Sequence, residues 1–81
     1  MGLLPDEVMG GKVRVVLVAG EKALVEQHRG LIGYETEQIL FRTKRGMLML
    51  EGEGMVITSF GAFDAVVEGK VHCIRMEEDD A

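Results

Sequence analysis

The chain has no tryptophan, one proline and one cysteine, and aromatic residues make up only 5% of its 81 residues. A single cysteine cannot form an internal disulfide, whereas small secreted domains usually depend on several, so we expect a reducing compartment, the cytoplasm. No apolar run approaches the roughly 20 residues that span a bilayer, and Asp6 and Glu7 lie where a signal peptide would be basic. We therefore expect no direct membrane span and no export.

Positive charge is also scarce. The net charge is −5, and residues 1–76 hold ten acidic and nine basic side chains, so Glu77, Glu78, Asp79 and Asp80 carry most of the excess. Because phosphate binding rewards clustered Lys and Arg, and the bases here are spread along the chain, we expect no nucleic-acid partner. We predict a flexible arm at 1–11, one domain at 12–76 and a disordered acidic tail at 77–81.

What the chain does have is a series of short apolar segments separated by glycine, with no long helical segment. Period-two alternation predicts a first strand at 12–18, apolar on both faces and so buried on both, which forms a hairpin with 22–27. Further short strands are expected at 31–34, 38–43, 47–50, 55–58, 64–68 and 70–76. The fold class is therefore all-β, a small two-layer antiparallel roll or sandwich, with a short β-solenoid-like stack as the alternative.

The strands are expected to end at turn glycines, namely Gly30, Gly46, Gly52 and Gly69. Residues 43–47 predict an antiparallel hairpin in which Gly46 takes the left-handed conformation. In the segment 38–43, Ile39 and Phe41 should face the core. The returning segment 47–50 is apolar on both faces, so we expect it between two layers or at a subunit contact, and an Asp at Met49 should disrupt folding or assembly.

The residues that carry chemistry are few and poorly spaced. His28, His72 and Cys73 lack metal-ligand spacing, and His72 and Cys73 are adjacent on a strand and should point to opposite faces, with Cys73 in the core. Ser59 and Cys73 lie in no recognised nucleophile motif. We expect no catalytic residue, no metal, no cofactor and no enzymatic activity.

Two groups of residues are candidates for protein contact. His28, Arg29 and Tyr34 lie on or beside a connection expected to be exposed, where donors and an amphipathic ring suit protein recognition. Phe60 and Phe63 flank Gly61 and are either a second docking point or a plug that closes one end of the core. Open sheet edges also favour pairing between copies of the chain.

The segment VEQHRGLIGYETEQILFRTKRGMLMLEGEGM, with the later VVEGKVHCIRM, resembles the YabP/YqfC family of small sporulation proteins from endospore-forming bacteria. The resemblance extends over about 13–76 and includes the His-Arg-Gly-Leu-Ile turn at 28–32 and the Tyr-Glu-Thr-Glu segment at 34–37. It implies a non-enzymatic protein needed for spore formation and associated with assembly of the spore envelope.

Two functions follow from these expectations. The favoured one is a structural or interaction module in spore-envelope assembly, located near the developing envelope, whose partners are itself, through sheet edges, and an unidentified spore-envelope protein. The alternative is a small β-barrel that binds a small ligand or nucleic acid, although so few aromatic residues offer few stacking platforms for single strands.

Overall fold

The computed structural model describes residues 12–19 and 21–78, and within them it contains six β-strands and no helix. The strands are β1 Arg14–Val18, β2 Lys22–Glu26, β3 Leu31–Glu35, β4 Gln38–Arg42, β5 Gly46–Phe60 and β6 Asp64–Glu78. The predicted all-β class is confirmed. In the described part of the chain, no helix has the length and apolar character to cross a membrane.

The six strands form one antiparallel sheet in the order β1-β2-β6-β5-β4-β3. Two long central strands, β5 and β6 of 15 residues each, carry a short hairpin on either side, β1–β2 beside β6 and β3–β4 beside β5. The hairpins predicted from 12–27 and around 43–47 are both present.

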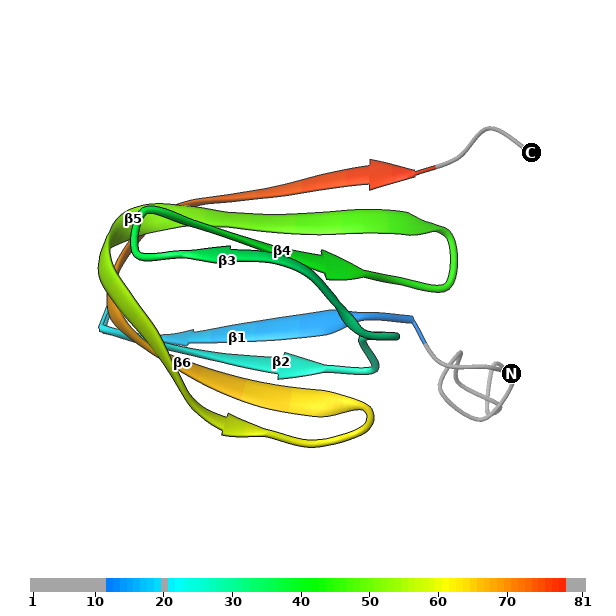
Figure 1. The fold of residues 1–81 in the computed structure, drawn as a ribbon, viewed down its shortest axis with the longest axis horizontal. Coiled ribbons are helices and arrows are strands. Elements are labelled where there is room, and N and C mark those ends of the chain that lie inside the picture. The colour runs from blue at the N-terminus through cyan, green and yellow to red at the C-terminus, as the bar shows by residue number, and fades with distance from the viewer. Residues whose placement is uncertain (1–11, 20, 79–81) are drawn as a thin grey trace, which may run out of the picture.

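β5 and β6 bend sharply together, so the single sheet folds over into two layers (Figure 1). One layer holds β3, β4, the first part of β5 and the last part of β6, because β4 pairs with β5 at 47–51 and these residues pair with β6 at 73–77. The other layer holds β1, β2, the first part of β6 and the last part of β5. The expected two-layer antiparallel roll is confirmed.

The bend corrects the predicted strand limits, because the strands do not end at residues 51–54 or at Gly69. At the bend Gly54 and Gly69 have positive φ angles of 61° and 131°, and a Cβ on Gly52 would overlap the carbonyl oxygen of Lys70. Register shifts between Glu51 and Gly52 accompany the bend. Glycine therefore lets two paired strands turn a corner together, a role that a local sequence pattern does not distinguish from a turn.

Gly46 differs from its prediction in a similar way. Its φ is not positive; it is the first residue of β5, and a Cβ there would overlap the carbonyl oxygen of Glu77 on β6. Glycine is required at this position by the close approach of the neighbouring strand and not by a left-handed turn.

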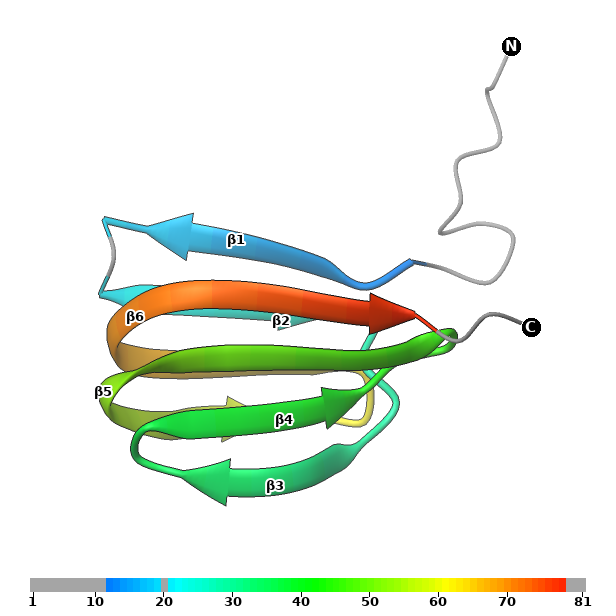
Figure 2. The same ribbon diagram turned by 90° about the horizontal axis from the view of Figure 1, so that it is seen from above.

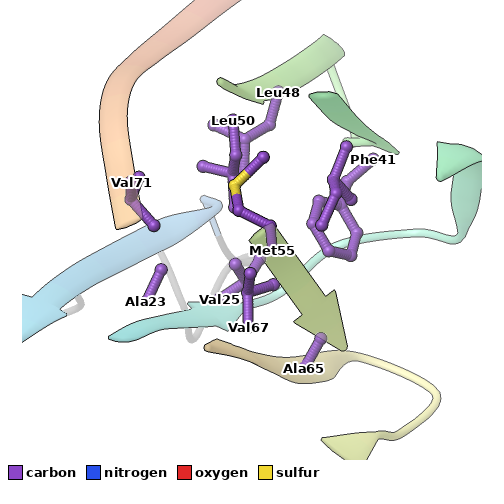
Figure 3. Close-up of a cluster of buried hydrophobic side chains, with 10 residues drawn as sticks. Ala23, Val25, Phe41, Leu48, Leu50, Met55, Ala65, Val67 and Val71 are labelled. Carbon is purple, nitrogen blue, oxygen red and sulfur yellow. The ribbon is translucent and has the colours of Figure 1, made fainter. Parts of the chain in front are cut away.

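The core lies between the two layers and is made by alternate residues of the strands (Figure 3). Ile39 and Phe41 are fully buried, as predicted. Leu48 and Leu50 also face the core, while Met47 and Met49 are half-buried on the outer face of an interior strand. The buried apolar residues are Ala23, Val25, Ile39, Phe41, Leu48, Leu50, Met55, Ala65, Val67 and Val71.

The prediction that both faces of the first strand are buried is wrong. β1 is at the edge of the sheet, where Leu17 and Val18 are 45% and 46% exposed. The predicted tail also begins too early, since Glu77 and Glu78 belong to β6. Residues 79–81 and the expected arm at 1–11 lie outside the described residues.

Candidate protein-contact site

The predicted contact residues meet at one corner of the roll, where the connection between β2 and β3 crosses from one layer to the other. This connection lies against the hairpin that joins β5 to β6. The backbone N–H groups of Gln27 and His28 both donate to the carbonyl oxygen of Phe63, at 2.6 and 3.1 Å. Gly61 N–H donates to the carbonyl of Asp64 at 2.7 Å and closes the hairpin. Two segments distant in sequence are thereby held as one surface.

His28 is the centre of this corner, but it is not on the surface. It is fully buried, and its Nε2 lies 3.0 Å from the carbonyl oxygen of Asp64, while its Nδ1 accepts the N–H of Gly30 at 2.9 Å. Since Nδ1 accepts, the proton is on Nε2, and both ring nitrogens have partners. The prediction that His28 forms part of an exposed contact is therefore wrong, because the residue is a hydrogen-bonded element of the core.

The imidazole ring is enclosed by two phenylalanines. Its centroid lies 5.1 Å from that of Phe41, which is in the core, and 5.0 Å from that of Phe60, with a nearly parallel stack of 25° in the second case. Phe60 itself remains 52% exposed. One face of Phe60 therefore closes the core over His28, and the rest of the ring faces solvent.

Arg29 and Phe63 complete the surface. The guanidinium carbon of Arg29 lies 5.5 Å from the centroid of the Phe63 ring, and Phe63 is 52% exposed. The backbone of Arg29 is fixed by a hydrogen bond of 2.7 Å from its N–H to the carbonyl of Arg42. A cation over an aromatic face is attracted by the ring quadrupole, so the contact stabilises the two side chains against each other.

We call Arg29, Phe60 and Phe63 the aromatic corner. It presents two large apolar rings and one guanidinium on a backbone fixed by hydrogen bonds. Tryptophan, tyrosine and arginine dominate binding energy at protein interfaces, and pre-organised aromatic anchors lose little conformational entropy on binding. The arrangement is suited to docking against another protein.

Tyr34 is not part of the aromatic corner. It lies on β3, is 47% exposed, and its phenol oxygen accepts a hydrogen bond of 2.8 Å from the N–H of Ile57 on β5. Its role in the structure is to join the edge of one layer to the edge of the other. The residue that sequence reasoning failed to connect with the corner is Phe41, which was predicted only as a core residue.

The prediction that His72 and Cys73 point to opposite faces is also wrong. The register of β5 and β6 shifts between Glu51 and Gly52, which pair with Cys73 and Val71, so His72 is bulged out of the ladder. Both residues line one shallow surface concavity with Glu35, Glu37, Gln38, Glu51 and Gly52. Cys73 is half-buried there and lies outside the core. Over 12–19 and 21–78, no group of three or more His, Cys, Asp or Glu side chains is arranged to hold a metal ion.

Comparison with known proteins agrees with the sequence resemblance. The chain is 25% identical over 75 residues to the Uncharacterized protein YqfC of Bacillus subtilis (strain 168), an alignment that covers 93% of this chain and 81% of the relative. No solved structure matches the chain. The sequence profile of the YabP family matches residues 10–81, so the chain belongs to the YabP family.

Proposed function

We propose that this protein is a non-enzymatic interaction module that acts in assembly of the spore envelope. The sporulation role rests on membership of the YabP family and on what the sequence resemblance implies for that family. The observation that supports an interaction role is the aromatic corner, in which Phe60 and Phe63 remain half exposed although the backbone that carries them is fixed.

The partner that this surface fits is a protein with an apolar depression, since the half-exposed rings of Phe60 and Phe63 must be accommodated together. The two residues are equally exposed, at 52%, and Phe63 is the one to alter because Phe60 is also stacked on buried His28. We place this partner among the proteins of the spore envelope, and the module in the cytoplasm beside the developing envelope.

Ligand binding inside the roll, the alternative function, gains no support. The space between the two layers is filled by ten buried apolar side chains, with Met55 at the centre of the cluster (Figure 3). A thermal-shift screen against metabolites and oligonucleotides tests this alternative, and a reproducible stabilisation by one of them would favour it.

The interaction role is tested by quantitative capture from sporulating cells with the tagged protein. The informative variant is Phe63→Ser, and the matched control is Val56→Ser, which alters a side chain of similar exposure, 47%, on β5 away from the aromatic corner. We expect Phe63→Ser to lose at least one spore-envelope protein that the wild type and Val56→Ser both retain. An unchanged set of captured proteins would contradict the proposal.

A further inference from the structure

Two strand edges remain unpaired on one side of the roll. β1 pairs with β2 only, and residues 71–78 of β6 pair with β5 only, within the part of the chain that the structure describes. The two edges belong to different layers, and β1 projects beyond the last part of β6, so no strand of the other layer covers it (Figure 2). Each layer thus offers one backbone edge that is available for a further strand.

On the opposite side of the roll, hydrogen bonds join the β3–β4 hairpin to the part of β5 at and just beyond the bend. There the carbonyl oxygens of Thr36 and Glu37 accept hydrogen bonds from the N–H groups of Met55 and Gly52 on β5, at 2.9 and 3.1 Å. Tyr34 adds the bond to Ile57 described above. Open edges are where sheets pair with other chains, and β3 also pairs with β4 only, so the β1–β6 side is one of two sides of the roll that have an open edge.

Exposed apolar side chains lie on these two edges, as they also do on β3 and the last part of β5. Leu17 and Val18 of β1 are 45% and 46% exposed, and Met76 of β6 is 42% exposed. Leu17 pairs with buried Ala23, and Met76 pairs with buried Leu48, so both face the inside of the roll and are uncovered only because their layers end there. A strand added to the edge of either layer would cover the apolar inner face of the other.

We propose that the added strand comes from another copy of the chain. In this reciprocal dimer, β1 of each copy pairs with residues 71–78 of the other copy. This inference rests on the proposed interaction role and specifies its self-association. β1 and the last part of β6 run in opposite directions (Figure 1). A two-fold axis parallel to the strands keeps their directions and exchanges the layers, so β1 of the second copy lies antiparallel beside β6 of the first. The projecting β1 of each copy then occupies the space beside the last part of β6 in the other copy, where the layer of that β6 ends.

Charge and face alternation select one register. Inner-facing residues must lie opposite inner-facing residues, which excludes every shift by one residue. Of the remaining choices, placing Arg14 opposite Arg75 sets like charges side by side, whereas moving it by two residues places it opposite Glu77. That register pairs residues of β1 with residues of the second copy's β6 as follows: Arg14 with Glu77, Val15 with Met76, Leu17 with Ile74 and Val18 with Cys73.

The surroundings of Arg14 are compatible with this contact. Its side chain is 70% exposed and lies 3.6 Å from Glu26 on the adjacent strand. In the dimer the guanidinium would lie between Glu26 and Glu77 of the second copy. Because the interface is isologous, the contact occurs twice.

The first test is a charge exchange, followed by light scattering of the full-length protein over a concentration series. We expect the wild type to approach twice its monomer mass of 8.9 kDa. Glu77→Arg should weaken the dimer about tenfold or more, because two cross-strand pairs of opposite charge become repulsive. The double variant Arg14→Glu/Glu77→Arg should restore most of the affinity, and the control Glu35→Arg on β3, on the opposite side of the roll, should leave the mass unchanged.

The second test uses the native Cys73. Val18→Cys places a thiol opposite Cys73 of the second copy, whereas within one copy these residues lie on the outer faces of different layers and cannot meet. Mild oxidation should therefore give a covalent dimer. Val56→Cys, and Val18→Cys combined with Cys73→Ser, should not.

A monomer at all concentrations, or a dimer that neither responds to the charge exchange nor forms the disulfide, would overturn the reciprocal pairing. The capture experiment on the aromatic corner is independent of this result, since Phe63→Ser alters neither edge. Loss of self-association with capture intact would refute only the dimer, and the reverse outcome would refute only the proposed function.

Discussion

The imidazole of His28 stacks on the ring of Phe60, with 5.0 Å between the ring centroids. This contact packs the connection between β2 and β3 against the β5–β6 hairpin, although the two residues are 32 positions apart in the sequence. The stack is supported by the hydrogen bonds of His28 to Asp64 and Gly30. The exposed aromatic corner therefore depends on a buried polar residue.

The first prediction concerns that buried residue. His28→Ala should reduce the free energy of unfolding by about 3 kcal/mol, because it leaves a cavity and deprives the Gly30 N–H and the Asp64 carbonyl of their partner. Denaturant unfolding measures the loss. His72→Ala is the matched control, since His72 has a 55% exposed side chain, and its effect should stay within about 0.5 kcal/mol. Equal effects of the two variants would contradict the described role of His28.

The bend of β5 gives a second prediction. Gly52→Ala should prevent folding or cost about 4 kcal/mol, because the new methyl group overlaps backbone of the paired strand. Gly54→Ala is the comparison: its φ is 61°, and nothing lies within 4 Å of the added Cβ, so only the left-handed conformation is penalised, at about 1 kcal/mol. Circular dichroism with thermal melting distinguishes the two, and a mild Gly52→Ala would show that the strands are not so close.

The two faces of β5 give a third prediction. Leu50→Asp places a charge in the core and should remove about 4 kcal/mol or more, a large part of the stability of a small domain. Met49→Asp changes a half-buried residue on the outer face that pairs with Arg75, so it should cost about 1 kcal/mol or less. The sequence predicted that an Asp at Met49 would disrupt folding, whereas the structure predicts that disruption for an Asp at Leu50. If Met49→Asp were the more damaging of the two, the assigned faces would be reversed.

Thr43 provides a prediction of increased stability. The residue is only 7% exposed, and its hydroxyl group is buried without a hydrogen-bond partner. Thr43→Val should therefore raise the free energy of unfolding by about 1 kcal/mol. Thr58→Val, where the exposed hydroxyl lies 3.3 Å from Glu68, should give no gain. A lower melting temperature for Thr43→Val would mean that the Thr43 hydroxyl group has a hydrogen-bond partner in solution.

Much of the fold is predictable from local pattern. Alternation placed Ile39 and Phe41 in the core, and the polar turn at 43–47 indicated the hairpin between β4 and β5. What the pattern does not contain is the length of β5 and β6, because glycine marks both a turn that ends a strand and a bend that continues it. The distinction depends on the paired strand, which is a long-range contact.

The site is less predictable than the fold for the same reason. His28 is a polar residue followed by Arg29 and Gly30, which is typical of an exposed turn. Its burial depends on Asp64, Phe41 and Phe60, all more than ten residues away in sequence. Arg29, Phe60 and Phe63 were identified as candidates, but only the folded chain brings them together. Tyr34 was grouped with them by proximity in sequence and lies elsewhere.

The most direct test of the central claim is the yield of heat-resistant spores when the gene in its own host carries Phe63→Ser, Val56→Ser or a deletion. We predict a strong loss of heat-resistant spores for the deletion and for Phe63→Ser, with a normal yield for Val56→Ser and equal protein levels for both variants. A normal yield with the deletion would contradict the sporulation role. A normal yield with Phe63→Ser alone would contradict the assignment of the aromatic corner as the contact site.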